Sequence, residues 1–260
     1  MSLALLLTLA ILGACGGFAA GFLGVGGGIL LFPLLLYLPP FLGLESLDAK
    51  TVAALVVSQV FFACLVGGTA HWRSGHVHGK TTLVAATAAM TGSFAGGVAS
   101  KWISEWFLLL LFGLTTLFAA ALMFLPAPSA DQEQIPVDQV AVPFILLSTL
   151  SFATGVVVGF LGAGNFVFVP LLIYILKVPT RIAIGSNLVI AVLSTFAGFL
   201  GKLLTGQVPL LMALAVITGA GVGAFAGEWS SERVSPRVLR YVYAGVIGVV
   251  AVRIWITILS

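Results

Sequence analysis

The chain has 260 residues, of which 60% are hydrophobic and 7% are charged. An average soluble domain has roughly 45–50% apolar and about 25% charged residues. So few charges cannot cover the surface of a soluble protein, and the composition therefore predicts a polytopic membrane protein with lipid around it. The net charge of +3 does not indicate a nucleic-acid partner, because the basic residues lie at the ends of apolar segments, where orientation in the bilayer explains them.

Eight apolar stretches have the length of about 20 residues that a helix needs to cross a bilayer core of about 30 Å. They are residues 3–20, 51–70, 81–100, 106–125, 140–159, 182–201, 208–227 and 237–258. Two further apolar stretches, 29–43 and 166–176, would reach only about 22 and 17 Å as helices that rise 1.5 Å per residue. We expect these two segments not to cross the membrane independently.

The chain contains an internal repeat. Three blocks match in order and spacing, namely 21–37 with 159–174, 67–77 with 198–208, and 92–100 with 223–231. The sequence therefore predicts a first transmembrane repeat at 1–125, a polar linker at 126–139 and a second repeat at 140–260.

Each repeat consists of a first helix, a glycine-rich break, a short segment and three full helices. Five segments are an odd number, so the second repeat is inverted relative to the first, as in many secondary transporters. A re-entrant first pair would leave three crossings, which is also odd. The predicted fold is an all-α polytopic membrane protein of two inverted-topology five-segment repeats with glycine-broken short or re-entrant helices.

The basic residues predict the orientation. One side collects Arg73, Lys80, Lys177, Arg181, Arg233, Arg237 and Arg240, and the other has Lys50, Lys101, Lys202 and Arg253. Cytoplasmic loops carry the excess of Lys and Arg, so we expect the first side to be cytoplasmic and both termini to be external.

Glycines interrupt the helical pattern at equivalent places in the two repeats. The first break contains Gly24, Gly26, Gly27 and Gly28, and the second contains Gly162, Gly164 and Asn165. Each Gly costs about 1 kcal/mol relative to Ala inside a helix, and a broken helix is tolerated in a membrane only where it is buried in protein or lines a cavity. We expect the breaks to meet near the midplane and to form the substrate site, where helix N-termini favour an anion. The alternative is that glycine merely allows close helix packing, which we prefer for Gly92, Gly96, Gly223 and Gly227.

Few polar side chains occur inside the predicted spans. Gln59 and Asn187 carry amides that should face the bundle interior and could contact a ligand. Ser194 and Thr195 are expected to bond to carbonyl groups of their own helix. Lys202 could add positive charge at the mouth of the cavity, or it could extend to the membrane surface as an interfacial lysine.

The same inventory argues against an enzyme. No carboxylate occurs deep in a predicted span, and the His-x-His pair formed by His76 and His78 has no third metal ligand nearby. We therefore expect no metal, no cofactor and no catalytic residues.

The glycine-rich break with its short Pro-bearing segment, the stretch RIAIGSNLVIAV at 181–192 and the block HWRSGHV at 71–77 resemble the TauE/SafE family of sulfite exporters over nearly the whole length. The resemblance implies a bacterial-type inner-membrane permease for small anions such as sulfite, sulfonates including sulfoacetate, or carboxylates. The family's glycine run maps onto the two breaks, and its small-polar motif maps onto Gly185, Ser186 and Asn187.

The chain departs from the family pattern in two places. Asn165-Phe166 stands where many members keep further glycines, and the first repeat has Ala53-Ala54-Leu55 where the second has Gly-Ser-Asn. The ligand environment should therefore be asymmetric.

The resulting hypothesis is a secondary transporter of small anions with a midplane site, with proton or sodium coupling left open. A passive anion channel and an intramembrane enzyme are the alternatives.

Overall fold

The computed structural model describes residues 2–23, 26–73, 79–123, 142–231 and 236–259. Every secondary-structure element in these ranges is helical. In chain order they are α1 (Leu3–Leu23), α2 (Gly28–Phe41), α3 (Ala49–Arg73), α4 (Gly79–Ala99), η1 (Ser100–Trp102), α5 (Glu105–Met123), α7 (Phe144–Leu161), α8 (Asn165–Pro170), η3 (Leu171–Ile175), α9 (Thr180–Leu204), α10 (Leu210–Ser231) and α11 (Pro236–Leu259). The predicted linker at 126–139 lies outside the described residues.

Seven of these helices are long and apolar enough to cross a membrane, and they coincide with the first seven predicted spans. The eighth predicted span corresponds to α11, whose residues Ile247–Ile256 form a shorter apolar stretch. The two short segments are also helical. Gly28–Phe41 has 14 residues, and Asn165–Ile175 continues from α8 into the single π-helical turn η3. The chain is a multi-pass membrane protein.

Prolines and glycines set the helix bounds that matter for the site. Pro143 has extended backbone and precedes the first residue of α7, so this helix begins later than the sequence predicts. At the other end of α7, Gly162 adopts a left-handed φ of 71° and its N–H donates to the carbonyl oxygen of Val158 at 2.7 Å. This is a common way to end a helix, and it turns the chain toward α8.

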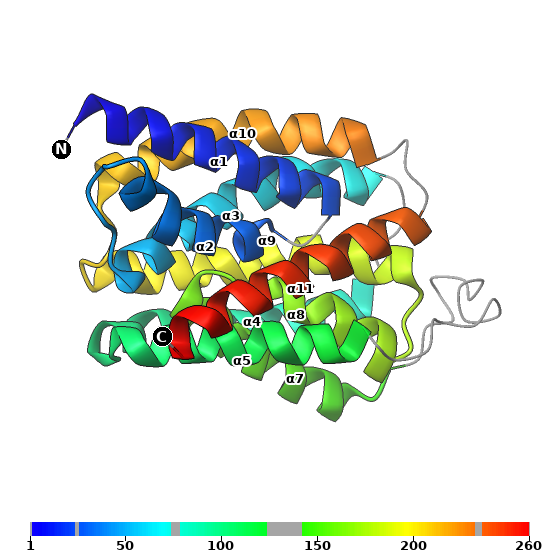
Figure 1. Cartoon of the computed structure of the whole chain (residues 1–260). Coiled ribbons are helices and arrows are strands. Elements are labelled where there is room, and N and C mark those ends of the chain that lie inside the picture. The colour runs from blue at the N-terminus through cyan, green and yellow to red at the C-terminus, as the bar shows by residue number, and fades with distance from the viewer. Residues whose placement is uncertain (1, 24–25, 74–78, 124–141, 232–235, 260) are drawn as a thin grey trace.

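Helices α3 and α9 form the centre of the bundle. Two-thirds of the span residues are buried in each of them, against at most 44% in the other spans. α3 packs against α9 and α10, α1 lies along α10, and α4 lies along α7 and α9. The first turn of α1 and the last turn of α11 lie at the same end of the bundle (Figure 1). Which end faces the cytoplasm remains a prediction.

Glycines bring the outer helix pairs into backbone contact. A Cβ atom added to Gly223 of α10 would overlap the carbonyl oxygen of Ala14 in α1, and one added to Gly92 of α4 would overlap that of Phe152 in α7. Lipid provides no hydrophobic force between helices, so small residues that allow backbones to approach closely are favoured. The packing role expected for Gly92, Gly96, Gly223 and Gly227 is confirmed.

Candidate substrate site

The two glycine-rich breaks lie against each other in the interior of the bundle. A Cβ atom added to Gly28 would stand 2.7 Å from the Cβ of Ala163, the residue between Gly162 and Gly164. The structure thus joins two segments that are far apart in the sequence. Gly24, which the sequence also places in the first break, lies outside the described residues.

The first break depends on residues without side chains. Gly26 and Gly27 have φ values of 85° and 70°, a region that strains other L-residues. A Cβ on Gly27 would overlap the carbonyl oxygen of Gly16 in α1, and one on Gly26 would lie 2.6 Å from Cγ1 of Val60 in α3. The chain can turn from α1 into α2 here only because glycine leaves this space free.

The second break rests on α3 as well. A Cβ on Gly162 would overlap the carbonyl oxygen of Ala53 and the backbone nitrogen of Val57. Gly164 lies so close to α7 that its Cβ would be 2.8 Å from Cγ2 of Val158. Both breaks therefore contact α3, so a movement of α3 would affect the two breaks together.

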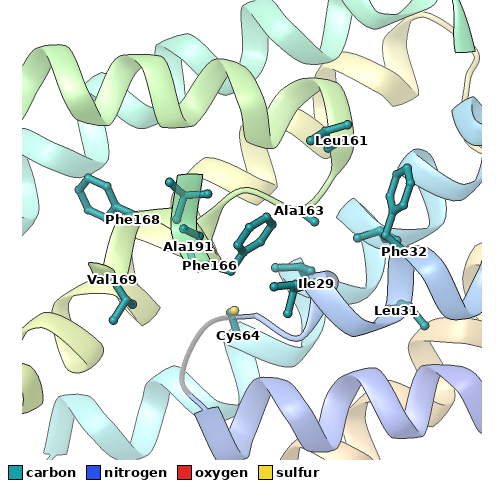
Figure 2. Close-up of a cluster of buried hydrophobic side chains, with 14 of the residues drawn as sticks. Ile29, Leu31, Phe32, Cys64, Leu161, Ala163, Phe166, Phe168, Val169 and Ala191 are labelled. Carbon is teal, nitrogen blue, oxygen red and sulfur yellow. The ribbon is translucent and has the colours of Figure 1, made fainter. Parts of the chain in front are cut away.

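Apolar side chains fill the space between the breaks. Ile29 and Phe32 come from α2, Phe166 comes from α8, and Cys64 of α3 lies beside them (Figure 2). The rings of Phe32 and Phe112 stack with centroids 4.4 Å apart, and Phe112 meets Phe166 edge to face at 6.0 Å. These side chains form a packed apolar layer beside the contact between the two breaks.

Gln59 lies beside the first break. Its side chain is fully buried on α3, and its Cδ is 3.4 Å from the position that a Cβ of Gly16 would occupy. Neither its Oε1 nor its Nε2 has a hydrogen-bond partner among the described residues. A buried amide without partners is energetically unfavourable, so Gln59 offers a donor and an acceptor that the fold itself does not use.

Asn165 is the first residue of α8, and only 2% of it is exposed. Its Oδ1 accepts a hydrogen bond from the hydroxyl of Ser194 at 3.4 Å, whereas its Nδ2 has no partner within the described part of the chain. The second break therefore contains an amide donor with no assigned partner. As expected, Ser194 and Thr195 also donate to the carbonyl oxygen of Ala191 in their own helix.

Ser186 and Asn187 are both buried in α9. Val56 of α3 lies against the first break, where its Cγ1 would be 3.0 Å from a Cβ atom added to Gly28.

Lys202 is fully buried near the end of α9. Its Nζ donates to the hydroxyl of Ser100 at 2.7 Å and to the carbonyl oxygen of Phe160 at 3.2 Å. Its side chain is therefore directed into the bundle. Phe160 lies in the last turn of α7, where a cation interacts favourably with the helix dipole, and this turn leads directly into the second break.

Three polar residues of the Lys202 network escaped the sequence analysis. Ser100 donates to Oε1 of Gln207 at 2.8 Å, or to the carbonyl oxygen of Gly97 at 2.7 Å, and Nε2 of Gln207 lies 2.6 Å from the hydroxyl of Thr205. Their positions at the ends of apolar segments are only a weak sign of a buried network, because polar residues are common there. Only the tertiary structure brings Ser100 and Lys202 together.

Within the described ranges, no group of three or more His, Cys, Asp or Glu side chains could hold a metal ion. His76 and His78, which the sequence analysis considered, lie outside those ranges.

Seven apolar helices of membrane-spanning length and two helix breaks packed together in their midst are the features of a multi-pass membrane transporter. The family model described as "Sulfite exporter TauE/SafE" matches residues 9–254, and the chain belongs to this family. The resemblance seen in the sequence is thereby confirmed.

Relatives agree with this assignment. A "Probable membrane transporter protein" of Xylella fastidiosa is 33% identical over 216 residues, which cover 80% of this chain and 79% of the relative. The "Probable membrane transporter protein YunE" of Bacillus subtilis is 25% identical over 248 residues, or 89% of this chain and 90% of the relative. No solved structure matches the chain.

Proposed function

We propose that the protein is a secondary transporter that moves a small anion across a bacterial inner membrane by alternating access. The proposed substrates are sulfite, sulfonates such as sulfoacetate, or small carboxylates. The observation that carries the proposal is the contact between the two breaks at Gly28 and Ala163, with buried amides beside them.

Reciprocal packing supports two inverted repeats. Gly17 of α1 meets the carbonyl oxygen of Ala220 in α10, and its repeat counterpart Gly155 of α7 meets that of Ala89 in α4. Replacing each residue of the first contact by its counterpart in the other repeat gives the second contact. Five segments in each half, together with first and last helices that start and finish at one end of the bundle, fit a second half that is upside down.

Neutral donors would hold the anion. A desolvated anion needs hydrogen-bond donors, and the amides of Gln59, Asn165 and Asn187 are all buried, with Gln59 beside the first break and Asn165 in the second. The first N–H groups of a helix have no acceptor within that helix, so the turn that begins at Gly28 adds backbone donors. The proposed binding set is Gly24, Gly26, Gly27, Gly28, Gln59, Gly162, Gly164, Asn165, Ser186 and Asn187, with Lys202 nearby. Neutral donors would also allow the anion to leave.

The apolar layer beside the two breaks favours a carrier over an open pore. Phe166 and Phe32 both contact the ring of Phe112, so an anion could pass only if these side chains separate. Movement of one repeat against the other would open the layer toward one end at a time.

Counterflow in liposomes tests the proposal. Purified protein would be reconstituted with unlabelled sulfite, sulfoacetate or acetate inside, and uptake of the same radiolabelled anion would be followed. A carrier gives saturable uptake with transient accumulation driven by the internal anion. Flux without counterflow would indicate a channel, and no flux with any of the three anions would overturn the proposed substrate class. Gly79→Ala is a suitable control variant, because a Cβ at this exposed position meets no atom within 4 Å.

A further inference from the structure

Lys202 places an ionisable group in the protein interior among uncharged partners. Its side chain is fully buried, and its two hydrogen-bond acceptors are a hydroxyl oxygen and a backbone carbonyl oxygen. A buried charge is usually compensated by an opposite charge. Neutral acceptors leave the ammonium only partly compensated, so the amine can exchange its proton more readily than one held by a carboxylate.

The hydroxyl of Ser100 suits both protonation states of this amine. It accepts a hydrogen bond from Lys202 Nζ at 2.7 Å, and its own hydrogen can point to Gln207 Oε1 or to the carbonyl oxygen of Gly97. A hydroxyl group is both donor and acceptor. When Nζ is neutral and has a lone pair, the same hydroxyl can turn and donate to it. The hydrogen bond between Ser100 and Lys202 can therefore form in both protonation states of the amine.

Charged residues of both signs lie at this end of the bundle. Lys50 at the start of α3 donates from its Nζ to the backbone carbonyl of Lys101 in η1 at 2.9 Å, and Oδ1 of Asp48 accepts a hydrogen bond from the backbone N–H of Thr51 at 3.0 Å. Helix α7 has no charged residue between Phe144 and Leu161. Glu105 begins α5, and its Oε2 accepts a hydrogen bond from the backbone N–H of Ala49 at 3.3 Å.

The proton on Lys202 acts on the second break through Phe160. The carbonyl oxygen of Phe160 belongs to the last turn of α7, two residues before the left-handed Gly162. An ammonium group at this position stabilises the end of the helix, and a neutral amine does so much less. The charge on Lys202 and the geometry of the break that leads to Asn165 are thus linked.

We propose that Lys202 is a proton-binding site that couples proton movement to anion transport. The inference rests on the proposed transport function and deepens it by naming the coupling ion. Its amine takes a proton from water at one side of the membrane to form an ammonium, and the ammonium returns that proton to water at the other side as the breaks change position. A sodium ion would instead need a cage of oxygen ligands, and an ammonium would repel it.

The test separates coupling from transport. Counterflow exchanges one anion for another and requires no net proton movement, whereas accumulation driven by a pH gradient requires coupling. Sulfoacetate is a suitable probe because its sulfonate stays ionised at neutral and moderately acidic pH. Sulfoacetate with one proton still carries a net negative charge, so the membrane potential is held at zero with valinomycin and equal potassium on both sides. With one proton per anion, a gradient of one pH unit should then accumulate sulfoacetate about tenfold in the wild-type protein.

Two substitutions of Lys202 should abolish this accumulation. Lys202→Met removes the ionisable group, and Lys202→Arg keeps a charge that does not titrate in proteins. We expect both variants to lose the tenfold accumulation, and the sulfoacetate counterflow of each variant serves as the reference for transport without coupling. Lys101→Met, a cation removed at the same end of the bundle, should keep both activities.

A measurement on the unaltered protein covers the case in which the variants do not fold. A pH-sensitive dye inside wild-type liposomes should report one proton moved with each sulfoacetate. Net sulfoacetate uptake without any proton movement in the wild-type protein would overturn the inference while leaving the proposed function intact. Full gradient-driven accumulation in Lys202→Met or Lys202→Arg would also overturn it. Absence of counterflow in the wild-type protein would instead count against the proposed function.

Discussion

Gly28 and Ala163 bring the two halves of the chain into contact, since a methyl group on Gly28 would lie only 2.7 Å from the Cβ of Ala163. The same methyl group would lie 3.0 Å from side-chain atoms of Val56 and Val60 in α3. No side chain fits at position 28 unless its neighbours move. The contact therefore fixes the distance between the two breaks.

Gly28→Ala should separate the breaks and reduce transport. Overpacking of a tight interior typically destabilises a protein by about 1–3 kcal/mol, so a lower melting temperature should accompany slower counterflow. Ala163→Gly removes the methyl group on the other side and should partly restore both properties in the double variant. Normal counterflow in Gly28→Ala alone would show that the distance between the breaks does not matter.

Gly223→Ala should weaken the contact between α1 and α10. The new methyl group would collide with the backbone of Ala14, and we expect a loss of about 1–3 kcal/mol. Gly221 lies on the same helix, and a methyl group added there would meet no atom within 4 Å, so Gly221→Ala should be neutral or stabilising by up to about 1 kcal/mol. Thermal unfolding in detergent compares the two variants, and equal melting temperatures would contradict the packing role of Gly223.

Gln59→Leu should weaken anion binding without lowering the stability of the folded protein. Because both polar atoms of the buried amide lack partners among the described residues, an apolar replacement of similar size should leave the folded state as stable or more stable. Anion binding should weaken by about 1–3 kcal/mol if Gln59 contacts the ligand. Ser58→Ala is the matched control, because this hydroxyl donates to the carbonyl oxygen of Ala54 at 2.7 Å within its own helix. Calorimetric titration with sulfite, sulfoacetate and acetate measures the affinities.

Asn165→Ala and Asn187→Ala should each weaken anion binding by about 1–3 kcal/mol, the usual loss when a buried hydrogen-bond partner is removed. Asn165 supplies a buried amide donor at the second break, and Asn187 lies fully buried in α9. Thermal-shift titration of the folded variants gives the change. Unchanged affinity in both variants would place the anion site elsewhere.

Cysteine labelling tests the orientation that the basic residues predict. In a Cys15→Ser background, Ser260→Cys should react with an impermeant maleimide in intact cells, and Gly75→Cys should react only after the membrane is permeabilised. The native Cys64 is buried and should contribute little background. The reverse pattern would mean that both termini are cytoplasmic.

The sequence alone determined the elements and their order. Seven predicted spans coincide with observed helices, because membrane thickness and backbone hydrogen bonding restrict a lipid-facing chain to long apolar helices. Glycine marked the positions where α1 and α7 end, and proline marked the position where α7 begins. These signals are local, so they can be read without knowledge of the partners.

Only the tertiary structure decided which side chains meet. A run of apolar residues does not specify its neighbour, because the side chains of lipid-facing and buried helices are chemically alike in a membrane. The sequence therefore left Lys202 between a cavity mouth and the membrane surface, and it offered no reason to connect this lysine with Ser100. Packing of α4, α7 and α9 through glycines buried the amine at the end of α7, where the second break begins.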